Sequence, residues 1–134
     1  MIDKKVMQEL LHKAKEAKKR AYSPYSGFSV GAALLTESGR VYLGANVENA
    51  SYTPTCCAER VAIFSAITDG ERKFSAIAVV GDSVPCMPCG VCRQVMCEFC
   101  GDDLTVIYEG EDGEARSLTL GELLPHSFRL EEKK

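Results

Sequence analysis

The chain has 134 residues and a net charge of −3, and its sequence pI is near 5.4. This acidic balance lacks the positive charge expected of a nucleic-acid-binding protein, and no apolar run approaches the roughly 20 residues that span a membrane. A hydrophobic fraction of 46% at this length predicts one domain, residues 1–134, around one core. Because the first residues lack the apolar core of a signal peptide, a cytoplasmic protein with reduced thiols is expected.

Hydrophobic periodicity and turn residues divide the chain into nine predicted elements. Helices are predicted where apolar residues recur every three or four positions, and strands where short apolar runs lie between turn residues. Thr119 and Glu122 have the spacing of a capping box, which predicts a short last helix. In chain order, the other predicted elements are a helix over 3–21, strands over 28–36 and 40–47, a helix over 57–70, a strand over 74–81, a helix over 89–100, and strands over 104–109 and 114–120.

This order of elements predicts an α/β fold, a three-layer α/β/α sandwich around a mixed five-stranded sheet. Two cysteine-containing segments, "TCCAERVAIF" (55–64) and "PCGVCRQV" (88–95), each begin a predicted helix. Neighbouring parallel elements could bring the two helix N-termini together, near the crevice where such sheets bind ligands.

The cysteine spacing indicates a metal site. Seven cysteines cannot all pair within one chain, and reduced thiols favour metal binding over disulfides. Cys89 and Cys92 are one helical turn apart, and Cys57 would supply a third sulfur from the other helix. Helix N-termini favour thiolates, and three protein ligands with one open position are typical of catalytic zinc. Gly90 is expected to allow close backbone approach between the two ligands of its own helix.

Two residues beside Cys57 predict what such a centre does. Arg60, three residues on, can hydrogen-bond the sulfurs and withdraw charge from a zinc with three thiolates. Glu59 can take a proton from water near the metal and return it elsewhere. The pattern C-x-E followed by P-C-x-x-C is the zinc-deaminase signature, with Cys as the first ligand.

Four longer segments resemble the cytidine deaminase family, within roughly residues 18–128: "PYSGFSVGAALL" (24–35), "GANVENASY" (44–52), "CAERVAIF" (57–64) and "PCGVCRQV" (88–95). The match is to the short, homotetrameric, three-cysteine branch. The resemblance implies one zinc ion per subunit and hydrolytic deamination of cytidine and 2′-deoxycytidine to uridine and 2′-deoxyuridine plus ammonia, in pyrimidine salvage.

The resemblance also implies a role for each site residue. Cys57, Cys89 and Cys92 would ligate zinc, and Glu59 would carry a proton to the ring N3 and later to the departing ammonia. The implied nucleoside-binding residues are Asn46 and Glu48 at the ribose 3′-hydroxyl, Phe28 beside the nucleoside, Ala58 through its backbone N–H, Phe128 stacked on the base from a neighbouring subunit, and Ala50 and Tyr52 in a loop shared across subunits.

Glu48 also bears on the size of the substrate. An anion beside the sugar pairs well with hydroxyl groups and poorly with phosphates. Together with the acidic net charge, it favours a free nucleoside as the small-molecule partner over a nucleotide or a polynucleotide.

Three alternatives remain at this point. The chain could deaminate another aminopyrimidine nucleoside. It could be a structural zinc module in which Cys86 or Cys97 completes a closed four-cysteine site. It could be an iron–sulfur protein, since Cys86, Cys89 and Cys92 run C-x₂-C-x₂-C, although the spacing to Cys97 departs from that pattern. As thiols without a ligand role, Cys56 is expected to face away from the ion, and Cys86 is expected to be exposed.

Overall fold

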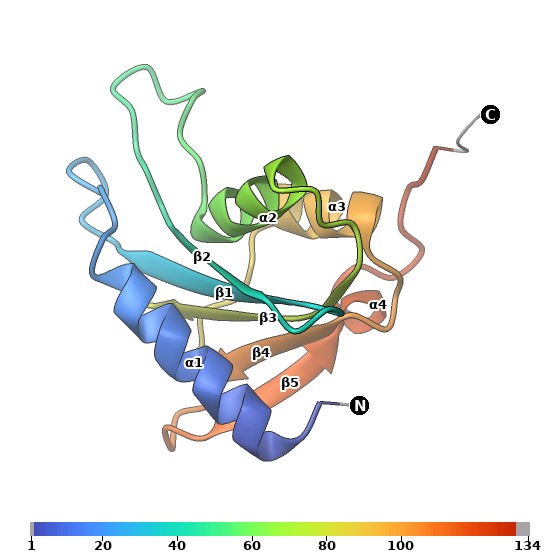
Figure 1. Ribbon diagram of the computed structural model, residues 1–134. Coiled ribbons are helices and arrows are strands. Elements are labelled where there is room, and N and C mark those ends of the chain that lie inside the picture. Colours follow the sequence, from blue (N-terminus) through green and yellow to red (C-terminus); the bar gives the residue numbers. More distant parts are fainter. Residues whose placement is uncertain (1, 131–134) are drawn as a thin grey trace.

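The computed structural model describes residues 2–130, which fold around a single five-stranded sheet (Figure 1). The strand order is β2-β1-β3-β4-β5, and β3 and β4 are parallel while the other neighbours are antiparallel. In chain order the elements are α1 (Lys4–Lys18), β1 (Val30–Thr36), β2 (Val41–Ala45), α2 (Ala58–Thr68), β3 (Phe74–Gly81), α3 (Gly90–Phe99), β4 (Thr105–Glu109), β5 (Ala115–Thr119) and α4 (Leu120–Leu123).

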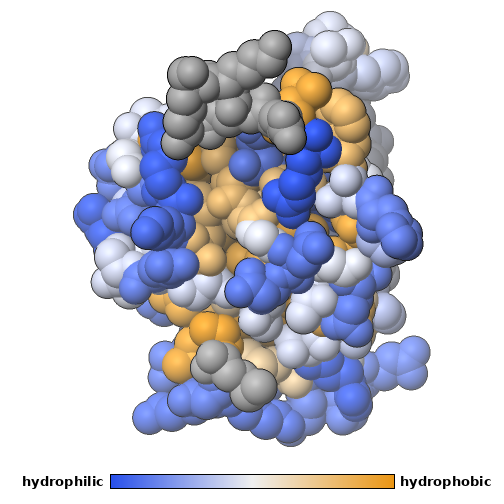
Figure 2. Space-filling model, turned by 90° about the vertical axis from the view of Figure 1, so that its right-hand side faces the viewer, coloured by the Kyte–Doolittle hydropathy of each residue, from blue (hydrophilic) through white to orange (hydrophobic). Residues whose placement is uncertain are grey.

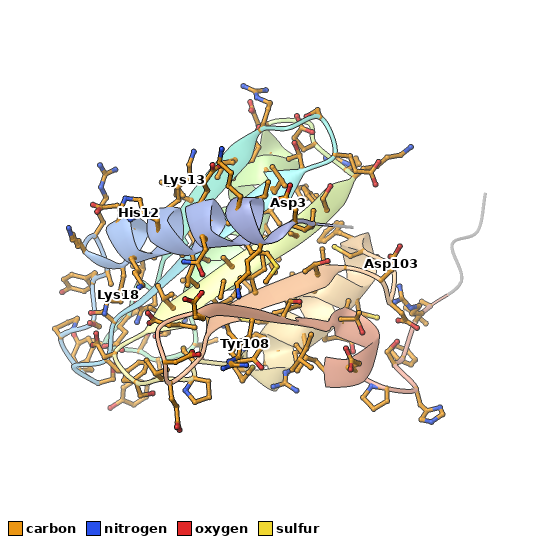
Figure 3. The ribbon with its side chains drawn as sticks, turned by 90° about the horizontal axis from the view of Figure 1, so that it is seen from below. Asp3, His12, Lys13, Lys18, Asp103 and Tyr108 are labelled. Atoms are coloured by element: carbon orange, nitrogen blue, oxygen red, sulfur yellow. The ribbon has the colours of Figure 1, made fainter. Side chains whose placement is uncertain are left out.

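Helices cover both faces of the sheet, so the predicted three-layer sandwich around a mixed sheet is confirmed. Helix α1 lies across one face, with the labelled His12 and Lys13 on its outer surface (Figure 3). Helices α2 and α3 lie side by side on the other face (Figure 1). Within residues 2–130, no helix combines the length and the hydrophobicity needed to cross a membrane.

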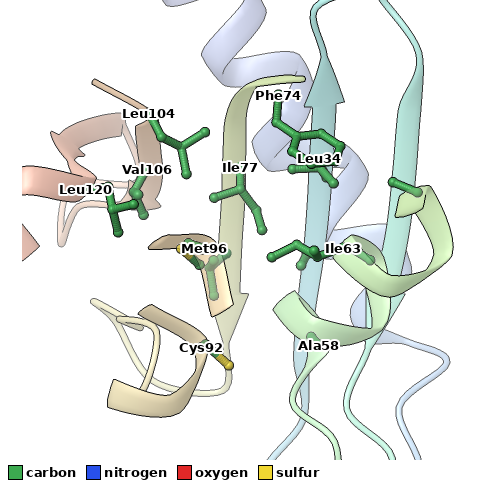
Figure 4. Packing of buried hydrophobic residues seen from close by; sticks show 14 of the residues in the cluster. Leu34, Ala58, Ile63, Phe74, Ile77, Cys92, Met96, Leu104, Val106 and Leu120 are labelled. Carbon is green, nitrogen blue, oxygen red and sulfur yellow. The ribbon is translucent and has the colours of Figure 1, made fainter. Parts of the chain in front are cut away.

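The central strand β3 divides the core into two layers, because successive side chains point to opposite faces of a sheet. Ile77 and Val79 point toward α2 and α3, as the close view in Figure 4 shows for Ile77. Ala76, Ala78 and Val80 point toward α1. Burying a side chain such as Ile77 stabilises the fold by about 1.5–3 kcal/mol. The small alanines on the other face let α1 pack close to the sheet.

Two glycines let helices approach strands at backbone distance. A Cβ on Gly31 would lie 2.0 Å from the Ala14 carbonyl oxygen of α1. A Cβ on Gly44 would lie 2.2 Å from the Ala58 carbonyl oxygen of α2. Since real Cβ atoms do not come this close, only glycine fits at either position. The contact at Gly44 sets the height of the first turn of α2 above β2, and this turn carries part of the candidate site.

Some predicted boundaries were wrong where contacts between distant parts of the chain redirect the backbone. The helix predicted over 3–21 ends at Lys18, because the Tyr22 N–H donates to the Asn46 carbonyl oxygen at 2.9 Å and draws the chain toward the β2 edge. The strand predicted from residue 28 begins at Val30. The predicted stop at Gly70 is confirmed, with φ of 98° immediately after the helix cap.

Candidate active site

Three cysteine sulfurs converge where the N-termini of α2 and α3 meet. Cys57 is the N-cap residue of α2, Cys89 is the N-cap residue of α3, and Cys92 lies one turn further along α3. The Cys57 Sγ lies 3.8 Å from the Cys89 Sγ, which lies 3.6 Å from the Cys92 Sγ. All three sulfurs lie within 4.8 Å of one another. The spacing therefore predicted which of the seven thiols come together.

These sulfurs fit a zinc ion. Tetrahedral zinc with Zn–S bonds of about 2.3 Å requires sulfurs about 3.8 Å apart. Cys92 is buried and Cys89 is exposed, so the group is accessible to solvent from one side. Among residues 2–130, no fourth Cys, His, Asp or Glu side chain joins this group. A three-ligand site with an open position matches catalytic zinc better than a closed structural site.

Charge around the cluster favours thiolates. Arg60 donates from Nη2 to the Cys57 Sγ at 3.3 Å, so the contact expected from its spacing is present. Hydrogen bonds from Cys92, Arg60 and Cys89 lower the pKa of Cys57 to about 5, although burial opposes this. The hydrogen bond to Cys57 raises the pKa of Cys92, because Cys92 keeps its proton to donate it. The lowered pKa of Cys57 favours its thiolate, which is the form that binds a metal.

Glu59 points its carboxyl group into the protein. The residue is only 3% exposed, and its Oε1 is buried without a hydrogen-bond partner in the described part of the chain. Burial, reinforced by the charge of Cys57, raises the pKa of Glu59 to about 7. A carboxyl group that titrates near neutral pH can both accept and release a proton. Its unpartnered oxygen is free to bond a reacting group.

Asn46 and Glu48 lie together beneath the loop that carries Phe28. The Asn46 Oδ1 accepts from the Val30 N–H at 2.8 Å, and its Nδ2 donates to the Phe28 carbonyl oxygen at 2.9 Å. Glu48 accepts from two backbone N–H groups, at 2.9 Å and 3.1 Å, and from the Ser26 hydroxyl. These bonds, with the Ser26 hydroxyl first, lower the pKa of Glu48. Both side chains hold the loop, and each keeps unused hydrogen-bonding capacity for a ligand.

Sequence reasoning missed a further anchor of this loop. The Asp82 carboxylate accepts from the Ser29 N–H at 2.7 Å and from the Lys18 Nζ at 2.9 Å. No periodic pattern links residues so far apart in the chain, so the spacing gave no signal for this anchor. The loop around Phe28 is therefore held from α1, from the end of β3 and from the segment after β2.

Cys86 occupies an unexpected place beside Phe28. A Cβ on Gly81 would lie 2.6 Å from the Cys86 Sγ and 3.0 Å from the Phe28 Cε1, so both side chains pack over this glycine. The expectation that Cys86 is exposed was wrong, because the thiol is half-buried and burial raises its pKa to about 11. Cys56 is half-buried and lies outside the metal-ligand group. Beyond the neighbouring backbone of its own helix, a Cβ on Gly90 would meet nothing within 4 Å, and the close approach expected within the loop between its two ligands stays a prediction.

Ala58 lies next to one of the three sulfurs, whereas Ala50, Tyr52 and Phe128 lie on other segments of the chain. Ala58 is buried in the first turn of α2, between Cys57 and Glu59. Ala50 and Tyr52 are exposed on the loop before α2, and Phe128 is 65% exposed beside the C-terminal half of α3. In Figure 1 this loop and the C-terminal segment project from opposite sides of the molecule. One subunit therefore does not bring all the predicted nucleoside-binding residues together.

A hollow opens at the end of the sheet away from the three sulfurs, with hydrophobic side chains gathered between hydrophilic ones (Figure 2). Its volume is about 710 Å³, and its lining includes Phe74, Phe99, Cys100 and Leu104. These residues lie at the start of β3, at the end of α3 and beside β4, whereas the sulfurs lie at the opposite ends of β3 and α3. Among the described residues, none of its lining atoms is a buried polar atom without a partner.

Comparison with known proteins supports the same centre. The family model "Cytidine and deoxycytidylate deaminase zinc-binding region" matches residues 4–109, which include all three cysteines. The chain belongs to this family. It is 50% identical to the cytidine deaminase of Halalkalibacterium halodurans, over 93% of this chain and 96% of that one. It is 46% identical to the cytidine deaminase of Sporosarcina psychrophila, over 94% and 93% of the two chains.

The fold agrees with solved structures of the family. The crystal structure of cytidine deaminase from Burkholderia pseudomallei matches with a TM-score of 0.86 and 50% identity, over 90% of this chain and 98% of that one. Cytidine deaminase from Mycobacterium tuberculosis matches with a TM-score of 0.81 and 42% identity, over 92% and 97% of the two chains. At these identities, the shared fold agrees with membership of the family.

Proposed function

We propose that this protein is a zinc-dependent hydrolase that converts cytidine and 2′-deoxycytidine to uridine and 2′-deoxyuridine with release of ammonia, in pyrimidine salvage. The observation that carries the proposal is the buried, unpartnered Oε1 of Glu59 beside three converging sulfurs. A structural zinc site needs no such carboxyl group, whereas hydrolysis needs a group that moves a proton next to the metal. An iron–sulfur cluster would require further thiolates, which the three-cysteine group does not supply.

Cys57, Cys89 and Cys92 would hold the metal. When bound, zinc supplies a Lewis acid that lets water act as a nucleophile near neutral pH. Glu59 would take a proton from a water molecule and pass it to N3 of the cytosine ring while the water oxygen bonds to C4. Glu59 would then take the second water proton and deliver it to the amino group, so that the C4–N bond breaks and ammonia leaves. Arg60 donates to Cys57 and so reduces the negative charge of the three thiolates.

The nucleoside contacts are part of the proposal. Asn46 and Glu48 would bind the ribose 3′-hydroxyl with the capacity that the Phe28 loop leaves free. The fixed position of this loop would place the Phe28 ring beside the nucleoside, and the Ala58 N–H would orient the base. The anionic Glu48 favours a free nucleoside over a nucleotide, because a phosphate close to it would be repelled.

We propose that the active enzyme is a cytoplasmic homotetramer whose active sites are shared between subunits. The exposure of Phe128, Ala50 and Tyr52 supports this assembly, because exposed side chains are available for contact with a neighbouring subunit. The seven free cysteines suit a reducing compartment. Mixing Phe128→Ala and Glu59→Gln subunits tests the sharing, because some mixed tetramers then contain an active site with neither substitution. Activity that stays absent after mixing contradicts shared sites.

The decisive experiment replaces Glu59 with the isosteric Gln. Loss of the proton carrier should lower kcat by about 10²–10⁴-fold, while zinc content stays at one ion per subunit by atomic absorption. The matched control is Glu98→Gln, an exposed glutamate on α3, which should retain wild-type turnover. Normal turnover in the Glu59 variant would refute the proposed role. Rates with cytidine, cytosine, cytidine monophosphate and other aminopyrimidine nucleosides then decide the substrate class.

A further inference from the structure

The C-terminal segment is attached to α3 by polar contacts. The Phe128 carbonyl oxygen accepts from the Gln94 Nε2 at 2.9 Å and from the Cys97 Sγ at 3.7 Å. Gln94 and Cys97 lie on neighbouring turns of α3, so side chains from two turns of the helix bind the same carbonyl group. His126, two residues earlier, has φ of 53°, a left-handed conformation that turns the chain just before Phe128.

Arg129 provides the strongest attachment. Its Nη1 donates to the Cys97 carbonyl oxygen at 2.6 Å and to the Cys100 carbonyl oxygen at 3.1 Å, and its Nη2 pairs with the Asp102 Oδ1 at 3.2 Å. Carbonyl groups at the end of a helix lack partners within the helix, and a cationic side chain there also meets the negative end of the helix dipole. A planar guanidinium can satisfy several acceptors at once, whereas an ammonium group offers no fixed fork.

Phe128 itself contributes little to this attachment. Its ring is 65% exposed, so the segment does not dock by burying the ring. The polar contacts hold the backbone on either side of Phe128, while its side chain stays largely exposed. An exposed aromatic side chain on a firmly held backbone is a pre-ordered contact, because little conformational freedom remains to be lost when a partner binds it.

We propose that Arg129 is a positioning residue that clamps the C-terminal segment to the end of α3 and thereby presents the Phe128 ring to the nucleoside site of a neighbouring subunit. This inference rests on the proposed function, in which Phe128 stacks on the cytosine base. Arg129 touches neither the substrate nor the metal. Its loss therefore raises KM, since the ring must be ordered during binding, and leaves kcat, which depends on Glu59 and the metal ligands, nearly unchanged.

A first test needs no activity. Because the sequence contains no tryptophan, Phe128→Trp creates a single fluorescent reporter at this position. Adding Arg129→Ala to this variant should lower its steady-state anisotropy and increase its quenching by acrylamide. The matched control adds Arg116→Ala instead, since Arg116 also pairs with an aspartate, at 3.0 Å, but lies on β5. Equal anisotropy and quenching with and without Arg129 would overturn the clamp even if the protein is an active deaminase.

A second test connects the clamp to the substrate. Arg129→Ala should raise KM for cytidine by about three- to tenfold, the range set by the cost of ordering one side chain on binding, with kcat within twofold of wild type. Arg129→Lys should recover part of this loss. Asp102→Asn removes only the ion pair with Arg129 and should raise KM for cytidine by a smaller factor. This variant provides the test if Arg129→Ala folds poorly.

A double-mutant cycle tests whether Arg129 changes KM through Phe128. In a Phe128→Leu background, Arg129→Ala should change KM by less than about twofold, because residues that act through one another are not additive. Full additivity of the two changes, or an unchanged KM in Arg129→Ala, would overturn the inference. A wild-type KM in Phe128→Leu alone would overturn both the inference and the stacking role, but the deaminase activity itself would stand.

Discussion

Replacing Gly44 with Ala tests whether close packing of α2 on β2 positions the metal ligands. The added Cβ would lie 2.2 Å from the Ala58 carbonyl oxygen and 2.6 Å from the Ala62 backbone nitrogen. Both obstacles belong to the helix backbone and cannot rotate away. Because favourable contacts of carbon begin near 3.5 Å, the first turn of α2 must move outward by about 1 Å.

A movement of this size is large for a metal site. Ligand distances tolerate shifts of only about 0.2 Å, and the displaced turn carries Cys57 and Glu59. We expect zinc affinity to fall by about 10–100-fold, the range typical of lost support around a metal site. The overpacked contact should also destabilise the fold by about 1–3 kcal/mol. At an unhindered position, Gly→Ala would instead stabilise the fold by about 0.4–1 kcal/mol.

Gly90→Ala is the matched control, because Gly90 is the first residue of α3 and a Cβ there would meet nothing within 4 Å. Both variants are dialysed against chelators of increasing affinity, and retained zinc is measured by atomic absorption alongside urea unfolding. Gly44→Ala should lose zinc to a weaker chelator and unfold at lower urea concentration than wild type, whereas Gly90→Ala should match wild type in zinc retention and unfold at an equal or slightly higher urea concentration. Wild-type zinc retention in Gly44→Ala, or equal losses in the two variants, would refute the positioning argument.

Three further predictions concern charged residues around the site. Arg60→Gln should retain zinc but lower kcat, because the hydrogen bond to the Cys57 Sγ at 3.3 Å is lost; wild-type kcat would contradict this. Arg93→Ala should speed zinc transfer to a chromogenic chelator, because Arg93 bonds the Pro88 and Leu123 carbonyl oxygens, each at 2.8 Å, beside Cys89; an unchanged transfer rate would contradict this. Bonds from Ser29 and Lys18 hold the pKa of Asp82 below its ordinary value of 3.8, so its stabilising contribution is complete above that pH and is lost as pH falls through the lower folded value. Urea unfolding should therefore show Asp82→Asn less stable than wild type at pH 7, with a gap that shrinks below pH 3.8; a constant gap would contradict the assignment.

The parts of the site that sequence could predict are those encoded by local spacing. Cys89 and Cys92 are one helical turn apart, and Glu59 and Arg60 lie within the turn that Cys57 begins, so helix geometry alone places each near the ion. The fold class was predictable for the same reason, because the periodic segments and their order define the layers.

The parts that sequence could not predict depend on contacts between distant segments. The cysteine spacing pointed to Gly90. Gly44, however, cannot carry a side chain, because a Cβ there would collide with the backbone of α2. Asn46 was expected at the sugar, yet its amide also holds the backbone on both sides of Ser29. Cys86 was expected in solvent, yet it packs over Gly81. Each of these roles depends on where a second segment lies in space.

The two helices that supply the sulfurs are supported by different kinds of interaction. Helix α2 packs on β2 through the close backbone contact at Gly44, whereas α3 is held by side-chain hydrogen bonds at both ends. Arg93 holds the chain beside Cys89, and Arg129 holds the opposite end beside Cys100. The Gly44 contact limits how closely α2 approaches β2, whereas the hydrogen bonds restrain both ends of α3. Helix α3 therefore links the end of the site at Cys89 and Cys92 to the C-terminal segment that carries Phe128.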